Sequence, residues 1–136
     1  MPRAQTAGHA LSGFSFDSNI IIDALAGHQP AAAEITRAVD LTGRAWISRM
    51  VWIEVLSKGA ETKLKSAEAL LKSFAVDELD SEIATRAAAL RRERARLKGP
   101  DAVILASALV RGRVLVTRNT EDFPAQMPGV RVPYTL

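Results

Sequence analysis

The stretch "FSFDSNIIIDAL", residues 14–25, changes character at its fourth residue. "FSF" is typical of a short strand that ends at Asp17, and "NIIIDALAG" is typical of a helix that Gly27 ends. Asp17 therefore stands where a strand turns into a helix. It fits two roles there, as the N-cap of the helix or as the first ligand of an active site. Taken alone, the cap is the simpler interpretation.

Strands and helices alternate along the rest of the chain. The sequence predicts further strands in "AWIS" (45–48), "FAVDEL" (74–79), "RVLVT" (113–117) and "VRVPYTL" (130–136), with Pro133 placing the last at an edge. It predicts helices at 31–41, 49–58, 61–73, 80–98 and 100–111. This alternation favours an α/β fold whose parallel sheet has helices on both faces.

Two helices have distinctive patterns. Ile83, Ala87, Leu90 and Leu97 would share one face of the long helix. "PDAVILASALVRG" begins with proline, ends with glycine and is apolar nearly all round, which is typical of a buried helix. In the helix at 49–58, the spacing of residues 50, 53 and 56 predicts the buried side.

Composition excludes several kinds of chemistry. The 136 residues fit one domain, and the absence of cysteine excludes disulfides, cysteine-ligated zinc and a thiol nucleophile. His9 and His28 are the only histidines, and neither has a spaced partner, so a histidine-based metal pair or triad is poorly supported. Catalysis would have to depend on carboxylates.

The termini and the charge give weaker indications. Residues 1–13 are predicted to be a flexible leader without the apolar core of a secretory signal, and 14–136 a single domain. No apolar run is long enough to cross a bilayer, so we expect a cytoplasmic protein. The net charge of +3 permits a polyanionic partner but fits an ordinary basic surface equally well.

Ligands of a doubly wound sheet bind beyond the carboxyl ends of its strands. Five acidic or amide side chains lie near such ends: Asp17, Glu54 and Asp101, and the pair Asn119 and Asp122 in "TRNTEDF". Each also has a structural explanation, as a cap, a helix surface residue, a dipole-matched acid or a loop residue. Asp23 is expected on the outer face of its helix.

Several carboxylates at one site repel each other and stay ionised only if a cation offsets them. Oxygen ligands without histidine or cysteine suit Mg²⁺ or Mn²⁺. Such an ion can bind a phosphate oxygen and a water, and can lower the pKa of that water. This chemistry is phosphodiester hydrolysis.

The pieces "FDSNIIIDAL", "ISRMVWIEVLSKG" and "GPDAVILASALVRGRVLVTRNTEDF" stand in the order found in PIN domains. The sequence resembles this family, and within it the VapC-type toxins of bacterial toxin–antitoxin pairs. The resemblance implies a three-layer α/β/α fold with a short central parallel sheet in the order 3-2-1-4-5. It also implies a Mg²⁺-dependent endoribonuclease that cleaves RNA, with Mn²⁺ as a second possible ion.

The resemblance carries the acidic site onto Asp17, Glu54 and Asp101, with Asp17 and Asp101 as metal ligands. The family's fourth acid often follows "TR", where this chain has Asn119. Either the amide oxygen of Asn119 or the carboxylate of Asp122 would complete the site. The resemblance also assigns supporting or substrate-contacting roles, to Ser18, Asn19, Thr117 and Arg118.

The resemblance further implies a homodimer and a cognate VapB-like antitoxin whose peptide covers the site. The apolar residues Trp46, Met50 and Trp52, or the helix "KSAEALLKSF", could serve either contact, although burial in the core explains most of them equally well. Six cations at 86–98 could hold RNA phosphates, bind an acidic antitoxin segment, or form a solvated helix face. Arg118 is the best single candidate for a phosphate contact.

Other functions remain to be weighed. A non-catalytic RNA- or protein-binding module on the same scaffold need not bind Mg²⁺, and Asn119 gives it some support. A phospho-receiver domain would need a second acid after the first strand and a lysine after "VLVT", which the sequence lacks. A haloacid-dehalogenase-like phosphatase would need aspartate where Asn19 stands.

Overall fold

Five short parallel strands form the centre of the protein, in the order β3-β2-β1-β4-β5. The computed structural model describes residues 13–136. The strands are β1 (Phe14–Phe16), β2 (Trp46–Ser48), β3 (Ala75–Asp77), β4 (Val114–Val116) and β5 (Val130–Arg131). The helices are α2 (Ser18–Leu25), α3 (Gln29–Thr42), α4 (Arg49–Lys58), η1 (Glu61–Lys63), α5 (Leu64–Lys72), α6 (Ser81–Glu93) and α7 (Gly99–Arg111). The predicted α/β fold and strand order are confirmed.

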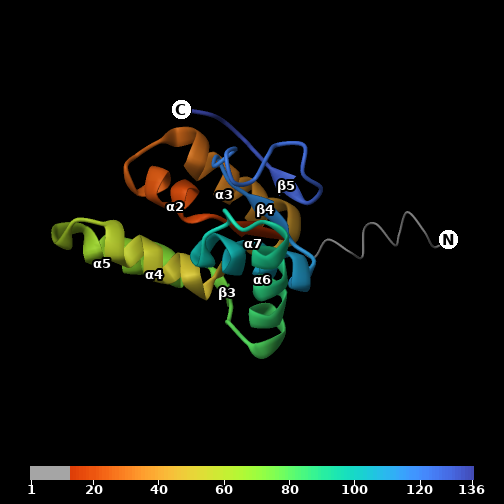
Figure 1. The fold of residues 1–136 in the computed structure, drawn as a ribbon. Helices are drawn as coiled ribbons and strands as arrows, with labels where there is room; N and C mark the ends of the chain where they lie inside the picture. The colour runs from red at the N-terminus through yellow and green to blue at the C-terminus, as the bar shows by residue number, and fades with distance from the viewer. Residues whose placement is uncertain (1–12) are drawn as a thin grey trace.

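The connection from β3 to β4 decides how the helices are layered. It passes over β2 and β1, so the right-handed crossover rule places α6 and α7 on the face opposite the earlier helices. Figure 1 shows the α6–α7 pair in front of the sheet and α3 behind it. The result is a three-layer α/β/α arrangement.

The middle of the sheet is the most buried part of the molecule. β1 pairs with both β2 and β4, and Phe16 on it is fully buried, as expected for a parallel strand covered on both faces. α7 buries Ala102, Ile104, Leu105, Ala106 and Ala108 among others, which confirms the predicted buried helix. β5 lies at the edge, as Pro133 predicted, with the proline just outside the strand.

Two predictions about helices were wrong. Val51 and Val55 form the buried side of α4, and Met50 and Leu56 pack against the core partly buried, but 53% of Ile53 is exposed, so the spacing of 50, 53 and 56 was wrong at Ile53. The long helix ends at Glu93 rather than near Lys98. Leu97 is buried as predicted, but in the turn that follows α6.

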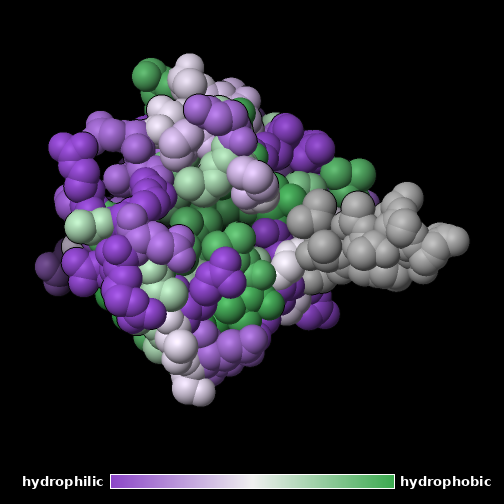
Figure 2. Space-filling view, turned by 45° about the vertical axis from the view of Figure 1, so that its right-hand side comes forward, coloured by the Kyte–Doolittle hydropathy of each residue, from purple (hydrophilic) through white to green (hydrophobic). Residues whose placement is uncertain are grey.

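Apolar side chains on the surface are spread over several elements. Figure 2 shows one face of the molecule, where hydrophobic side chains gather toward the middle and hydrophilic ones surround them. The large exposed apolar residues are Val39, Leu41, Ile53, Leu79, Leu109 and Leu136. In the part of the chain that the structure describes, no helix is long and apolar enough to cross a membrane.

Most of the predicted leader, residues 1–12, lies outside the described residues. Gly13, the last residue of the predicted leader, extends the pairing of β1 with β4. Its carbonyl oxygen accepts a hydrogen bond from the backbone N–H of Val114 at 2.9 Å.

Candidate active site

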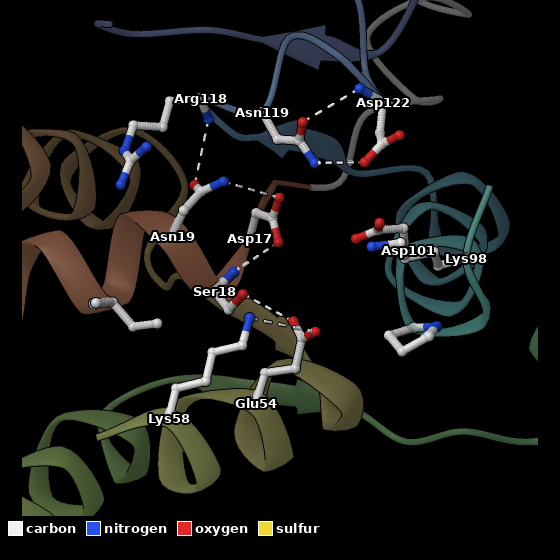
Figure 3. Close-up of a pocket in the computed structure, with 12 residues that line it drawn as sticks. Asp17, Ser18, Asn19, Glu54, Lys58, Lys98, Asp101, Arg118, Asn119 and Asp122 are labelled. Atoms are coloured by element: carbon white, nitrogen blue, oxygen red, sulfur yellow. Dashed lines mark hydrogen bonds and ion pairs between the residues drawn. The ribbon is translucent and has the colours of Figure 1, made fainter. Parts of the chain in front are cut away.

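A cavity of about 340 Å³ opens at the carboxyl ends of β1 and β4. Four elements build it: the β1–α2 turn, the middle of α4, the start of α7 and the loop after β4. Its walls are made by Asp17, Ser18, Asn19, Ile22, Glu54, Lys58, Lys98, Pro100, Asp101, Arg118, Asn119 and Asp122. Figure 3 shows the side chains of Asp17, Glu54, Asp101 and Asp122 reaching in from different sides.

Asp17 is held rigidly at the bottom of this cavity. It is the N-cap of α2, and its Oδ1 accepts a hydrogen bond from the backbone N–H of Ser18 at 2.7 Å. Its Oδ2 accepts hydrogen bonds from the Thr117 hydroxyl at 2.7 Å and from Asn19 Nδ2 at 3.3 Å. Burial raises the pKa of Asp17, although the hydrogen bonds from Thr117 and Ser18 oppose the rise. The cap and the site role predicted for Asp17 are compatible.

Glu54 approaches from α4 and is also oriented by neighbours. Its Oε1 accepts a hydrogen bond from the hydroxyl of Ser18 at 2.8 Å, and its Oε2 lies 3.9 Å from the ammonium group of Lys58. The ion pair to Lys58 is loose, because these two charged groups lie at the limit of ion-pair distance. Glu54 therefore faces the cavity with one oxygen fixed by Ser18.

Asp101 lies among like charges. It lies in the first turn of α7 and is half-buried. Burial, together with repulsion from Asp17, Asp122 and Glu54, raises the pKa of Asp101 to about 6. The other three carboxylates therefore lie close enough to Asp101 for their charges to affect its protonation.

Asn119 and Asp122 form a small closed loop after β4. Asn119 Nδ2 donates to Asp122 Oδ2 at 3.0 Å, and Asn119 Oδ1 accepts from the backbone N–H of Asp122 at 3.2 Å. The amide of Asn119 is therefore engaged on both sides. Asp122 also acts on Asp101, because its negative charge contributes to raising the pKa of Asp101. Of the two residues, Asp122 is the one that meets the acids.

The comparisons with known proteins agree with this geometry. A family model described as the PIN domain matches residues 15–126. The chain belongs to the PIN domain family. A comparison with curated proteins gives no match. The predicted likeness to VapC-type PIN proteins is confirmed by this match and by the solved structures that follow.

Solved structures similar to this PIN domain come from toxin–antitoxin systems. A chain of a toxin–antitoxin complex from Klebsiella pneumoniae is 36% identical, with a TM-score of 0.76 over 90% of this chain and 98% of that one. A chain of DNA-bound VapBC from Salmonella typhimurium is 27% identical, with a TM-score of 0.71 over 89% and 96%. A VapBC2 structure from Rickettsia felis, 18% identical with a TM-score of 0.71 over 87% and 95%, shows the shared fold alone.

The PIN domain also contains an ionic cluster that the sequence did not indicate. Arg118 makes two hydrogen bonds to Asp23, at 2.6 and 3.0 Å, and the Tyr134 hydroxyl donates to Asp23 at 2.8 Å. The hydrogen bond from Arg118 holds the pKa of Asp23 below its usual range. The prediction that Asp23 lies on the outer helix face was therefore wrong, because Arg118 and the C-terminal segment cover it.

Arg118 is consequently less available for a phosphate than the sequence suggested. Figure 3 shows its guanidinium turned toward α2, away from the carboxylates. Its backbone N–H donates to Asn19 Oδ1 at 3.3 Å, which fixes Asn19 beside Asp17. Arg118 thus helps to hold Asn19 in place, while its own guanidinium points away from the carboxylates. Reasoning from sequence also missed Lys58 in the cavity wall, since it does not lie at a strand end, and it considered Lys98 only as one of the six cations at 86–98.

The donor set fits a hard divalent cation. It offers only oxygen, from carboxylates that repel each other in the absence of a counter-charge. No three acidic or histidine side chains among residues 13–136 are spaced to hold a metal ion by themselves. A cation here would have one or two carboxylates as ligands and would fill its remaining positions with water and substrate, as Mg²⁺ commonly does.

Proposed function

We propose that this PIN domain is a metal-dependent endoribonuclease that hydrolyses RNA phosphodiester bonds and acts as the toxin of a toxin–antitoxin pair. One observation carries the proposal. Asp17 and Asp101 face each other's charge in a cavity at the sheet edge, and no Arg or Lys in the described part of the chain forms an ion pair with either. A bound divalent cation would offset the negative charge of these carboxylates and could at the same time bind an RNA phosphate.

Asp17 and Asp101 are the residues that would hold Mg²⁺ or Mn²⁺. Asp17 presents an orientation fixed by Ser18 and Thr117, and Asp101 comes from a separate element on the other side of the cavity. When bound, the ion would polarise the phosphate and activate the attacking water. Asp122 would act from the remaining side, in place of the acid expected at Asn119.

The chain's own side chains have distinct tasks in this proposal. Glu54, with one oxygen held by Ser18, can accept a hydrogen bond from the attacking water through its other oxygen and so position it. Thr117 and Asn19 keep Asp17 in place, and the Arg118–Asp23 pair keeps Asn19 in place. The carboxyl group of Asp101, whose pKa lies near 6, is ionised above that pH and able to bind a cation there.

The test is a cleavage assay with purified protein, labelled RNA and Mg²⁺, comparing wild type with Asp17→Asn. Asparagine keeps the size and the capping ability of aspartate but loses its charge. We expect cleavage by the wild type that EDTA abolishes, and none by the variant. Undiminished cleavage by Asp17→Asn would refute the proposal. Mapping cleavage sites in cells after induction of both proteins would then identify the RNA target.

We also propose that a VapB-like antitoxin covers the site. An apolar groove of about 280 Å³ adjoins the acidic cavity and shares Ile22 and Lys58 with it. Leu25, Val55 and Leu64 supply further apolar wall. An amphipathic helix of a partner would fit such a groove. The sequence offered a surface around Trp46 and Trp52 as one option for this contact. In the structure, the guanidinium of Arg113 lies over the Trp46 ring and that of Arg49 lies over the Trp52 ring.

A homodimer is part of the same proposal. Size measurement of the purified protein by light scattering tests it, and a clean monomer at micromolar concentration would count against it. The alternative function, a binding module without catalysis, draws on Asn119 standing where an acid is expected. It predicts RNA binding that neither Mg²⁺ nor Asp17→Asn changes, so the assay above separates the two functions.

A further inference from the structure

The break between α6 and α7 creates a short basic turn at residues 94–98. The turn is well ordered: Leu97 is buried, and its backbone N–H donates to the carbonyl of Arg94 at 2.9 Å. Arg91 Nε donates to the carbonyl of Leu97 at 3.0 Å, which ties the turn back to α6. With Leu97 anchored inward, Arg96 and Lys98 on either side of it are exposed. The turn therefore presents cations from a fixed backbone.

A second cavity lies against this turn and continues the acidic one. It measures about 650 Å³ and is lined by Arg94, Ala95, Arg96, Lys98, Glu121 and Asp122. Lys98 and Asp122 line the acidic cavity as well. A ligand that occupies the acidic cavity and extends past Lys98 would therefore enter the basic one.

Arg96 and Lys98 in the turn differ from several arginines of this protein, because they are not paired with carboxylates. Elsewhere, Arg49, Arg113, Arg118 and Arg131 each pair with a carboxylate through two hydrogen bonds. Within residues 13–136, Arg96 and Lys98 form no ion pair. Their charge is free to bind an anion.

Arg94 joins the turn to the loop of the acidic site. Its Nη2 donates to the backbone carbonyl of Asp122 at 2.6 Å. Its Nη1 is buried and has no hydrogen-bond partner in the described structure, which is costly for a donor. No carboxylate forms an ion pair with Arg94 in this part of the chain, so its positive charge adds to that of Arg96 and Lys98 at the wall of the cavity.

We propose that Arg94, Arg96 and Lys98 form a phosphate-binding subsite that holds the RNA strand beside the scissile bond. The inference rests on the proposed nuclease function. A strand whose scissile phosphate lies among carboxylates has further phosphates on either side, and these need cations. Lys98 precedes the first turn of α7, whose N-terminal dipole adds to the positive potential. Two acidic side chains in the wall, Glu121 and Asp122, oppose binding, and of these Asp122 also belongs to the acidic cavity.

The test compares two charge-matched double variants. Arg96→Ala/Lys98→Ala removes two cations of the turn. Lys72→Ala/Arg86→Ala removes two cations on α5 and α6 that line neither cavity. Binding of labelled single-stranded RNA is measured in the Asp17→Asn background over a range of salt concentrations, and cleavage is measured with Asp17 intact. Thermal melting shows that each protein is folded.

We expect the turn variant to bind RNA about tenfold more weakly for all sequences, with the salt dependence of log K falling by about 1.4 for two lost contacts. KM should rise while kcat changes less than about twofold. The Lys72→Ala/Arg86→Ala control should bind and cleave like its parent. Glu121→Gln, which removes one opposing charge, should bind RNA more tightly than the parent.

Equal effects of the two double variants, or none from the turn variant, would overturn the subsite. If the wild type cleaves no RNA, the nuclease proposal fails, but the binding measurements still decide the subsite. Binding of an oligoglutamate peptide to the same variants is the remaining measurement. If the turn variant loses this peptide and keeps RNA, the turn binds an acidic protein segment and the RNA subsite is refuted.

Discussion

Two sets of carboxylates in this PIN domain contrast in how their charge is balanced. Asp23, Glu34 and Asp77 each accept two hydrogen bonds from an arginine, Arg118, Arg131 and Arg113 respectively. Asp17 and Asp101 are also shielded from water, yet neither is paired with an arginine or lysine in the part of the chain described. Instead, like charges surround Asp101.

Pairing with an arginine distinguishes the acids that stabilise the fold from those that line the candidate active site. A buried carboxylate without an opposite charge destabilises a protein, even where, like Asp17, it accepts hydrogen bonds and caps a helix. The protein pairs other acids with arginines, so the missing opposite charge is a feature of the cavity. We propose that the unpaired set binds a cation and substrate, and that the paired set stabilises the structure.

The largest expected effect is on catalysis by Asp101→Asn. Loss of this carboxylate should lower kcat/KM for RNA by at least about a thousandfold, because several kcal/mol of transition-state stabilisation depend on the cation. Melting of the metal-free protein at pH 7 should not fall, since a repelled charge is removed. Asp40→Asn, an exposed acid on α3, is the control and should cleave normally. A variant that cleaves RNA normally would place Asp101 in the structural set.

Asp77→Ala should have the opposite profile. It leaves the Arg113 guanidinium buried beside Trp46, without the carboxylate that holds it at 2.8 and 2.9 Å. Denaturant unfolding should show a loss of about 3 kcal/mol, the usual cost of breaking a buried ion pair. The remaining folded protein should cleave RNA with the wild-type kcat. An Asp77→Ala protein as stable as the wild type would break the contrast between the two sets.

Asp122→Asn should have an intermediate effect and sharpen the assignment of the fourth acid. We expect about a tenfold loss in kcat/KM, because Asp122 faces Asp101 without being one of the two main ligands. The pKa of Asp101 should fall, since Asp122 contributes to raising it. Asn119→Ala serves for comparison, and a larger loss from Asn119→Ala would assign the role to Asn119 instead. Steady-state kinetics over pH 5–8 measure both quantities.

The smallest effect is on the pH dependence of stability. The pKa of Asp101 is about 6 in the folded protein and about 3.8 when unfolded, so the folded state binds its proton more tightly. Stability without metal should therefore fall as pH rises from about 4 to 6, by about 1 kcal/mol after allowing for solvent screening. Asp101→Asn should remove this fall. Unfolding curves at pH 4.5 and 7 give the change in the free energy of unfolding between these pH values for each protein. An equal change for the wild type and Asp101→Asn would contradict the account.

Sequence patterning predicted the strands and the buried helix because these depend on apolar periodicity and on turn residues, whereas the strand order followed from the resemblance to PIN domains. It also placed Asp17, Glu54 and Asp101 in one crevice, since strand ends converge in a parallel sheet. Pattern alone missed the burial of Asp23, because its partners Arg118 and Tyr134 are about a hundred residues away in the chain. No local signal records such pairing.

The end of α6 shows a second limit. Arg94, Arg96 and Lys98 have good helix propensity, and Leu97 continues the apolar spacing of the helix. The structure ends the helix at Glu93 all the same, and Leu97 reaches the core from a turn. Tertiary packing overrides propensity here. The sequence therefore indicated these cations only as part of a helix face, and it did not indicate the turn or the cavity beside it.

Titration calorimetry with Mg²⁺ and with Mn²⁺ tests the central claim most directly. The account predicts that the wild type binds the cation at pH 7.5, that binding weakens below about pH 6 as Asp101 takes up a proton, and that Asp17→Asn weakens binding at least about tenfold. Asp40→Asn should bind like the wild type. A wild-type protein that binds neither ion, or an Asp17→Asn protein that binds as well as the wild type, would contradict the account.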